Sequence, residues 1–254
     1  MLVSRRMLRG AVASLAVTTL IAGCSSAPPQ PSATVGRAID QPLSVAVKAV
    51  PLVDQSGHTF TLGSLRGTTV FIAPFLTLCP DVCPFTTGNF AQMQASVDAA
   101  KKHGHVRLIE FSIDPDRDTV SRLASYASRN HVTWTLARSD AAGTKVMKQF
   151  FHYIAIKSPL TTSDTIDWMT GQPTTYDVDH SDGYNVIDAQ SVDRFVSNAS
   201  PHFHGILPAK LRAFLSKEGL NNLRKPDPRG WRPAGALEAI SWVLGSEIPL
   251  APLE

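Results

Sequence analysis

Apolar strand-like runs alternate with helical patterns along this 254-residue chain, and this alternation constrains its fold more than any other feature. Residues 69–76 and 106–113 are apolar and β-rich, as in strands that are buried on both faces. Helical periodicity follows each run, at about 85–102 and 118–130. Strands that alternate with helices in this way predict an α/β fold, a mixed sheet with helices on both faces.

Further elements extend the predicted sheet on either side. A β-hairpin over residues 53–62, with Gly57 in its turn, is expected before the first buried strand. Residues 155–174 have no clear period and are expected to form an inserted loop. The other predicted elements are strands at 133–137, 183–188 and 192–197, and helices at 141–153, at 208–217 with Gly219 as its C-terminal cap, and at 234–244.

The N-terminal segment, residues 1–23, has the pattern of an export signal. Three arginines precede an apolar run, residues 10–23, which is shorter than the roughly 20 residues that a spanning helix needs. The segment Ile21-Ala22-Gly23-Cys24 resembles the bacterial lipobox, which makes Cys24 the expected lipid anchor. The paired Arg5 and Arg6 also resemble a twin-arginine signal. We therefore expect a lipid-anchored protein on the extracytoplasmic face of the cell membrane, with an uncleaved membrane anchor as the alternative.

The rest of the chain is expected to comprise a flexible tether at 24–42, one domain at 43–219 and a C-terminal extension at 220–254. A hydrophobic content of 43% excludes a disordered chain. The signal segment holds three of the 24 basic residues and none of the 21 acidic ones, so the remainder is formally neutral. Nothing in this charge balance favours nucleic-acid binding.

Cys79 and Cys83 are the only cysteines besides Cys24. They lie where a buried strand runs into a helix, the edge at which open α/β sheets usually place their sites. Residues four apart in a helix share a face, and a helix N-terminus favours the thiolate form. The pair could close a reversible disulfide, or it could bind a soft metal ion such as Cu(I) or Zn²⁺.

Two sulfur ligands leave the coordination of a metal ion incomplete, so we expect a histidine as the third ligand. His180 directly precedes the predicted strand 183–188, and it would reach the cysteines if that strand neighbours the strand before Cys79. His202 and His204 could form a weak metal site of their own.

Four aspartates lie near these candidates. Asp118 is expected to cap the helix that follows Pro115, with outer-shell roles for Asp114 and Asp116 near a metal as the alternative. Asp81, on the cysteine loop, is expected to be exposed, either steering a partner or simply solvated.

Three segments stand out when taken in order: Thr77–Pro84 with its Cys-Pro-Asp-Val-Cys-Pro loop, Phe111–Thr119, and Tyr176–Ser181 with Val-Asp-His. Together they resemble the SCO/SenC family of copper-binding assembly proteins for cytochrome c oxidase. The resemblance implies a thioredoxin-like fold with extra N-terminal strands, and one copper ion bound by Cys79, Cys83 and His180. It further implies a partner, the copper-site subunit of an oxidase, whose binuclear site receives copper or has its cysteines reduced. The tail after residue 219 has no recognised counterpart.

Two functions follow from these observations. The leading one is a non-enzymatic copper chaperone, with an exposed low-coordinate site that hands copper over by ligand exchange. The alternative is an extracytoplasmic thiol–disulfide oxidoreductase that uses Cys79 and Cys83, although three residues separate them where thioredoxin-type enzymes usually have two. A peroxidase is disfavoured by the loop spacing, and a static disulfide by the small loop it would close.

Overall fold

The computed structural model describes residues 27–161 and 165–252, so the predicted signal segment and Cys24 lie outside the described residues. The strands are β1 (Arg37–Pro42), β2 (Leu52–Asp54), β3 (Thr59–Phe60), β4 (Thr69–Phe75), β5 (Val106–Ser112), β6 (Thr135–Arg138), β7 (Ala155–Pro159), β8 (Tyr176–His180), β9 (Tyr184–Ile187) and β10 (Val192–Ser197). The helices are α1 (Val45–Ala49), the 3₁₀ turn η1 (Leu62–Leu65), α2 (Cys83–Ala99), α3 (Val120–Asn130), α4 (Ala141–Phe151), α5 (Ala209–Arg212), α6 (Lys217–Arg224) and α7 (Pro233–Leu244).

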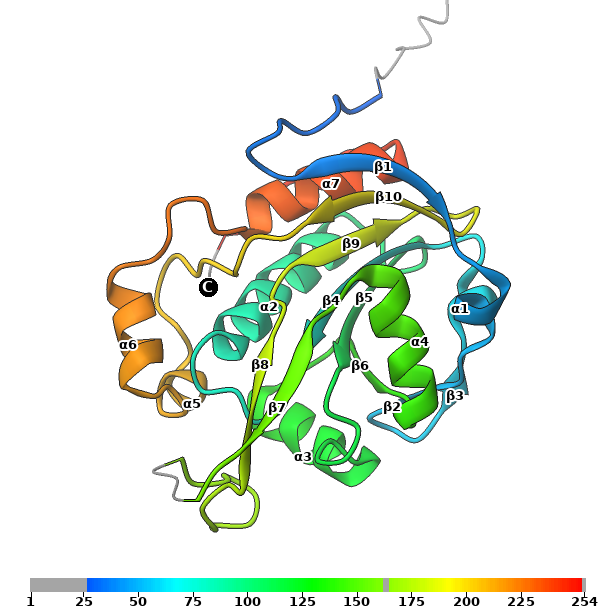
Figure 1. Cartoon of the computed structure of the whole chain (residues 1–254). Coiled ribbons are helices and arrows are strands. Elements are labelled where there is room, and N and C mark those ends of the chain that lie inside the picture. Colours follow the sequence, from blue (N-terminus) through cyan, green and yellow to red (C-terminus); the bar gives the residue numbers. More distant parts are fainter. Residues whose placement is uncertain (1–26, 162–164, 253–254) are drawn as a thin grey trace, which may run out of the picture.

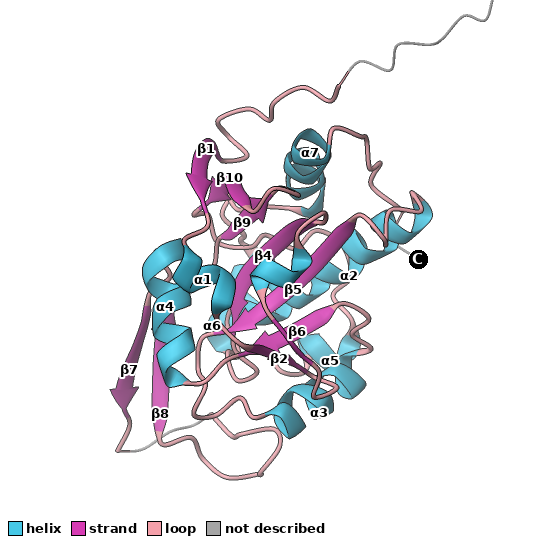
Figure 2. Cartoon of the chain, turned by 90° about the vertical axis from the view of Figure 1, so that its right-hand side faces the viewer, coloured by secondary structure: helices cyan, strands magenta, loops and turns pink. Residues whose placement is uncertain are grey.

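Eight of these strands form one mixed sheet in the order β1-β10-β9-β4-β5-β6-β2-β3 (Figure 1). The central strands β4, β5 and β6 are parallel, and β9 joins β4 in the antiparallel direction. Helices α2 and α7 cover one face of the sheet, whereas α1 and α4 cover the other (Figure 2). The predicted mixed sheet with helices on both faces, and the N-terminal hairpin β2–β3, are therefore confirmed.

Strand β4 forms the centre of the core because all seven of its residues are buried. The ring of Phe71 packs edge-on against Phe90 of α2, with 5.3 Å between the ring centroids. Trp231 and Ile240, from the C-terminal part of the chain, belong to the same apolar cluster. The segment predicted as a C-terminal extension therefore packs on the sheet that carries the cysteine loop.

The inserted loop predicted at 155–174 is wrong in part, because β7 pairs with β8 as a separate antiparallel hairpin. Figure 1 shows this hairpin projecting beside the main sheet. Residues such as Lys157 are exposed, so β7 carries no apolar alternation that could have predicted it. His180 is consequently the last residue of a strand rather than part of a connecting loop.

Two further segments differ from expectation. Residues 37–42, at the end of the predicted tether, form β1, which pairs with β10 at the sheet edge. The helix predicted at 208–217 is wrong in part, because α5 ends at Arg212 and a second helix, α6, follows with Ser216 as its N-cap. Gly219 is therefore inside α6, and it packs so closely on the cysteine loop that a Cβ atom would lie 2.3 Å from the Pro80 carbonyl oxygen.

Candidate metal centre

The structure brings Cys79, Cys83 and His180 together at one point. The Nε2 atom of His180 lies 3.3 Å from Sγ of Cys79 and 3.8 Å from Sγ of Cys83. Both cysteines are free thiols. Within residues 27–161 and 165–252, these three side chains form the one cluster of potential metal ligands with all donor atoms within 4.8 Å of one another.

The cysteine loop follows the carboxyl end of β4 and leads into α2. Helix α2 begins at Cys83, slightly before the predicted start, and Pro84 follows within its first turn. Cys79 lies ahead of the helix, so the two sulfurs converge because the loop folds back and not because they share a helical face. The predicted convergence thus has a different geometric cause.

A buried aspartate anchors the base of this loop. The Asp118 carboxylate accepts hydrogen bonds from the Thr77 backbone N–H at 3.2 Å, the Thr77 hydroxyl at 2.5 Å and the Ser112 hydroxyl at 2.6 Å. The prediction that Asp118 caps the next helix is wrong, since the Thr119 hydroxyl accepts from the Arg122 N–H instead. Asp118 holds the residue two positions before Cys79.

His180 is the last residue of strand β8, which brings it close to the cysteines. Arg117 holds this strand through contacts with Tyr176. The Nη2 atom of Arg117 donates to the Tyr176 carbonyl oxygen at 2.9 Å, and its guanidinium lies 4.0 Å from the Tyr176 ring centroid. The Tyr176 hydroxyl donates to the buried Asp114 carboxylate at 2.9 Å. Asp114 therefore supports the strand that bears His180, whereas Asp116 is largely exposed and pairs with Lys157.

The expected neighbour relationship also holds, since β9 pairs directly with β4. Between β8 and β9, Asp182 lies behind the imidazole, with its Oδ1 atom 2.9 Å from His180 Nδ1. The carbonyl oxygen of Ser181 is equally close to Nδ1. These partners occupy Nδ1 and leave Nε2 directed at the sulfurs, which is the arrangement that metal-binding histidines usually show.

The two thiols differ in acidity because they share one hydrogen bond. The Cys83 thiol, and then His180, hold the pKa of Cys79 well below its usual value despite burial. Burial and the neighbouring Cys79 raise the pKa of Cys83 well above its usual value. Burial works against the charged form of His180, but hydrogen bonds to Asp182 and Cys79 outweigh it and raise the pKa of His180 to about 11. Both shifts favour a Cys79 thiolate beside a His180 imidazolium in the metal-free site.

Both cysteines are buried and the His180 side chain is largely covered, so the expected exposed site is wrong. Cys79 is 6% exposed, Cys83 is 1% exposed, and the His180 side chain is 6% exposed. Asp81 is likewise half-buried rather than exposed, because it accepts a hydrogen bond from the Ser216 hydroxyl. No local sequence pattern predicts that Asp81 is covered, because Ser216 lies more than 130 positions away in the chain.

The donor spacing suits one soft metal ion. A sulfur and a nitrogen bound at about 2.3 and 2.0 Å to one ion lie roughly 3.5–3.7 Å apart. The observed separations of 3.3 and 3.8 Å bracket that range. Thiolate and imidazole donors suit copper and zinc, and unlike carboxylates they do not favour hard cations.

The other predicted histidine pair does not form a site. His202 is buried, and its Nδ1 atom lies 3.2 Å from the Asp227 carbonyl oxygen and 3.2 Å from Arg232 Nε. His204 is exposed. Neither belongs to the cluster of potential metal ligands described above.

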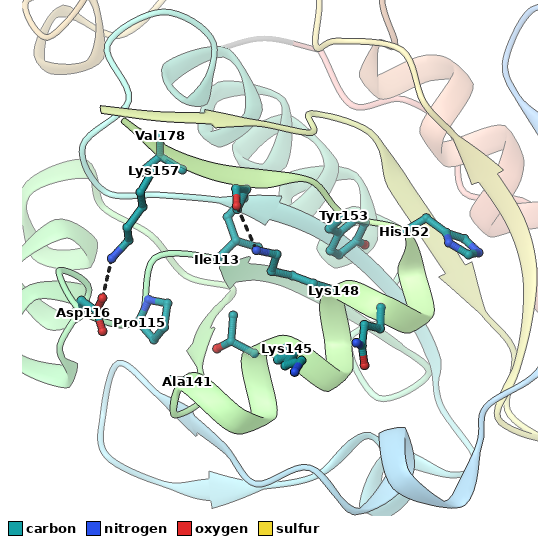
Figure 3. Close-up of a pocket in the computed structure, with 13 residues that line it drawn as sticks. Ile113, Pro115, Asp116, Ala141, Lys145, Lys148, His152, Tyr153, Lys157 and Val178 are labelled. Carbon is teal, nitrogen blue, oxygen red and sulfur yellow. Dashed lines mark hydrogen bonds and ion pairs between the residues drawn. The ribbon is translucent and has the colours of Figure 1, made fainter. Parts of the chain in front are cut away.

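A cavity of about 670 Å³ lies under the β7–β8 hairpin, against α4. Figure 3 shows Lys157 directed at Asp116 on one side and Tyr153 and His152 on the other. The lining includes neither cysteine nor His180, so this cavity is separate from the candidate metal centre. Among the described residues, none of the helices combines the length and the apolar character needed to cross a bilayer.

Sequence comparison agrees with these observations. The SCO1/SenC family pattern matches residues 44–204, more than half of the chain. A SCO1 protein homolog of Bacillus subtilis is 33% identical over 94 residues, which cover 37% of this chain and 47% of that protein. A protein of Stutzerimonas stutzeri, named for copper binding, is 30% identical over 87 residues, which cover 34% of this chain and 42% of that protein. The chain thus matches less than half the length of these two relatives.

Structural comparison supports the fold. The solution structure of apo Sco1 from Thermus thermophilus superposes with a TM-score of 0.50 at 20% identity, covering 75% of this chain and 95% of that one. The fold is therefore thioredoxin-like, as the sequence resemblance implied. With the family pattern spanning both the cysteine loop and His180, the chain belongs to the SCO1/SenC family.

Proposed function

We propose that this protein is a copper carrier in which Cys79, Cys83 and His180 hold one copper ion. The observation that carries the proposal is the convergence of His180 Nε2 on both sulfurs, at 3.3 and 3.8 Å. Membership of the SCO1/SenC family and the likeness to a protein named for copper binding support copper over zinc as the cargo.

Release would proceed by exchange of ligands. The lowered pKa of Cys79 favours its thiolate form, so copper binding would displace protons chiefly from His180 and from Cys83. An accepting protein then replaces the donors one at a time, with a thiolate or imidazole of its own. Because little of the three donor side chains is exposed, the acceptor would enter beside Cys79, the more exposed of the two cysteines.

The destination we propose is the binuclear copper site of a cytochrome c oxidase subunit. Family membership supports this destination. The signal pattern of residues 1–23 and the lipobox-like Cys24 support a lipid anchor that holds the protein on the extracytoplasmic face of the membrane. The proposed domain spans residues 43–219, with β1 paired at its edge, and residues 220–254 form a C-terminal extension that packs on its sheet.

Copper titration of the full chain in detergent tests the carrier function. Competition with a Cu(I) chelator should give one tightly bound copper per chain. The variants Cys79→Ser and His180→Ala should bind far more weakly, and His58→Ala, whose side chain is 82% exposed, should match the wild type. Undiminished affinity in the Cys79 and His180 variants would show that the proposal is wrong.

The lowered pKa of Cys79 beside Cys83 favours one second candidate, a thiol–disulfide oxidoreductase. The Cys79 thiolate would attack a substrate disulfide, form a mixed disulfide and expel one substrate thiolate. Cys83, after losing its proton, would attack the Cys79 sulfur and release the second thiolate. The substrate gains two electrons, and the Cys79–Cys83 disulfide needs a thiol reductant for the next cycle.

Disulfide reduction in metal-free buffer separates the two candidates. A reductase should keep its rate in the Cys24→Ser variant, which spares the redox pair, and lose it in Cys79→Ser. If wild type and His180→Ala reduce a model disulfide at the same high rate, and His180→Ala still binds copper as the wild type does, the redox function gains over the carrier.

A further inference from the structure

The C-terminal part of the chain contacts both halves of the candidate metal centre. The family pattern ends at residue 204, so the contacts made by Ser216, Gly219 and Trp231 lie beyond it. The geometry points to a positioning role: these three residues, the C-terminal clamp, hold the cysteine loop and the His180 segment at the separation that copper requires. This inference rests on the proposed copper carrier function.

The first contact holds the cysteine loop. The Ser216 backbone N–H donates to the Pro80 carbonyl oxygen at 3.0 Å, and the Ser216 hydroxyl donates to the Asp81 carboxylate. Gly219 lies so close that an added Cβ atom would approach the Pro80 carbonyl oxygen to 2.3 Å and the Asp81 Cα atom to 3.2 Å. Pro80 directly follows Cys79, so this contact restrains the backbone next to the more acidic sulfur.

The second contact holds the residue behind His180. The Trp231 indole N–H donates to the Asp182 carbonyl oxygen at 2.9 Å. The carboxylate of Asp182 lies 2.9 Å from His180 Nδ1 and accepts a hydrogen bond from the Ser200 hydroxyl at 2.9 Å. The position of the imidazole thus depends on Asp182, and the position of Asp182 depends on Trp231.

Trp231 is a rigid point of attachment. It is 4% exposed, and its ring packs edge-on against Tyr184 of β9 and Phe71 of β4, with centroid distances of 5.4 and 6.1 Å. Its backbone N–H donates to the Ser200 carbonyl oxygen at 2.9 Å. The indole N–H is therefore fixed relative to the sheet, and its hydrogen bond fixes the backbone of Asp182 in turn.

A fixed second contact matters because His180 reaches the cysteines from a hairpin outside the main sheet. Groups that orient a metal ligand typically contribute 10- to 100-fold to metal affinity. Loosening of either contact should therefore weaken copper binding chiefly by losing the histidine, while the two sulfurs can still bind. A purely structural role would change stability without this selective loss.

The test uses the full chain in detergent and the variant Trp231→Phe, which keeps the ring packing and removes the N–H. Trp242→Phe is the matched control, because Trp242 belongs to the same C-terminal segment but packs on Phe195 of β10. The measurements are copper transfer to a chelator, the histidine nitrogen coupling in the electron paramagnetic resonance spectrum of the Cu(II) form, and thermal unfolding. We expect Trp231→Phe to lose copper about tenfold faster with weakened nitrogen coupling, and Trp242→Phe to behave as the wild type.

A second variant probes the contact at the cysteine loop. Gly219→Ala forces α6 away from Pro80, whereas Gly104→Ala adds its methyl group in open space. We expect Gly219→Ala to lose copper faster than the wild type, and Gly104→Ala to lose it at the wild-type rate. Wild-type transfer rates and nitrogen coupling in both Trp231→Phe and Gly219→Ala would overturn the clamp. Absence of copper binding by the wild type would instead overturn the carrier function, so the two failures are distinguishable.

Discussion

The Nε2 atom of His180 lies 3.3 Å from the Sγ atom of Cys79, although 101 positions separate the two residues in the chain. The contact joins a hairpin outside the main sheet to the loop that follows its central strand. It places an imidazole beside a thiol with little exposure to solvent, and this contact lowers the pKa of Cys79 and raises that of His180.

Cys79 should be the ionised cysteine of the metal-free protein at neutral pH. The Cys83 thiol donates to it and His180 lies beside it, which together lower the pKa of Cys79, whereas burial raises that of Cys83. Thiolate absorbance in the ultraviolet should therefore be present at pH 7 and should disappear in Cys79→Ala.

The same absorbance measures the contribution of the neighbouring thiol. Cys83→Ala removes the largest factor that lowers the pKa of Cys79, so its thiolate should form only at higher pH. Cys83→Ser keeps a donor and should lie between the alanine variant and the wild type. Equal thiolate absorbance in Cys79→Ala and wild type would contradict this charge assignment.

Asp167→Ala should destabilise the protein by loosening the attachment of Asp167 and Trp168 to Arg122 and Thr77. Both carboxylate oxygens of Asp167 accept from Arg122 Nη1, at 3.0 and 2.9 Å, and the adjacent Trp168 indole donates to the Thr77 carbonyl oxygen at 2.8 Å. Removing one partner of a buried ion pair costs about 3–5 kcal/mol, and the partial exposure of Asp167 favours the lower end. Urea unfolding measures the loss, with the exposed Asp98→Ala as control.

The cost of Asp167→Ala should also depend on pH. Burial raises the pKa of Asp167, but hydrogen bonds from Arg122 and nearby backbone N–H groups outweigh burial and lower it. Its stabilisation is therefore fully present above the unfolded pKa of about 3.9 and is lost as the pH falls through the lower folded value. Equal costs at pH 7 and at strongly acid pH would contradict this account.

Glu110→Gln should change how stability varies with pH. Burial raises the pKa of Glu110 to about 8, although the Thr87 hydroxyl and the Trp134 indole N–H both donate to its carboxylate, at 3.0 and 2.7 Å. The unfolded value is about 4.3, so the contribution of Glu110 to wild-type stability should fall as the pH rises from about 4 to 8 and then stay constant. The slope from this group is at most about 1.4 kcal/mol per pH unit.

Stability measured between pH 7 and 8 distinguishes the contribution of Glu110 from that of a second buried acid, Asp193. Burial raises the pKa of Asp193 to about 7, so its contribution is mostly complete below that pH range. Urea unfolding across the pH series should show a flatter curve in Glu110→Gln than in wild type, and the exposed Glu247→Gln should leave the curve unchanged. A Glu110→Gln curve parallel to that of the wild type would show that Glu110 stays ionised in the folded protein.

Gly183→Ala should destabilise the junction between β8 and β9. An added Cβ atom would lie 2.0 Å from the Ser197 carbonyl oxygen, so the strand end must shift. Overpacking of this kind typically costs about 1–3 kcal/mol. Thermal unfolding of Gly183→Ala should show a lower transition temperature, whereas that of Gly104→Ala should be unchanged. A wild-type transition temperature in Gly183→Ala would mean that the strand end shifts at no cost in stability.

Local sequence was enough to predict the central strands, the helices between them and the kinds of donor atom in the site. Strands such as β4 are buried on both faces, so their composition is almost uniformly apolar and local sequence reports it directly. Cys79 and Cys83 were also visible locally, because they lie four positions apart at the end of that strand.

How the site is completed and covered depends on contacts between segments that are distant in the chain. Strand β7, the Asp118–Thr77 bonds and the approach of Ser216 and Trp231 all depend on partners far away in the chain. Hydrogen bonds between distant polar groups leave no periodicity in either segment, so the sequence could suggest His180 as a ligand but not what orients it. That the three donors are largely covered likewise follows from packing across the whole chain, which no local pattern records.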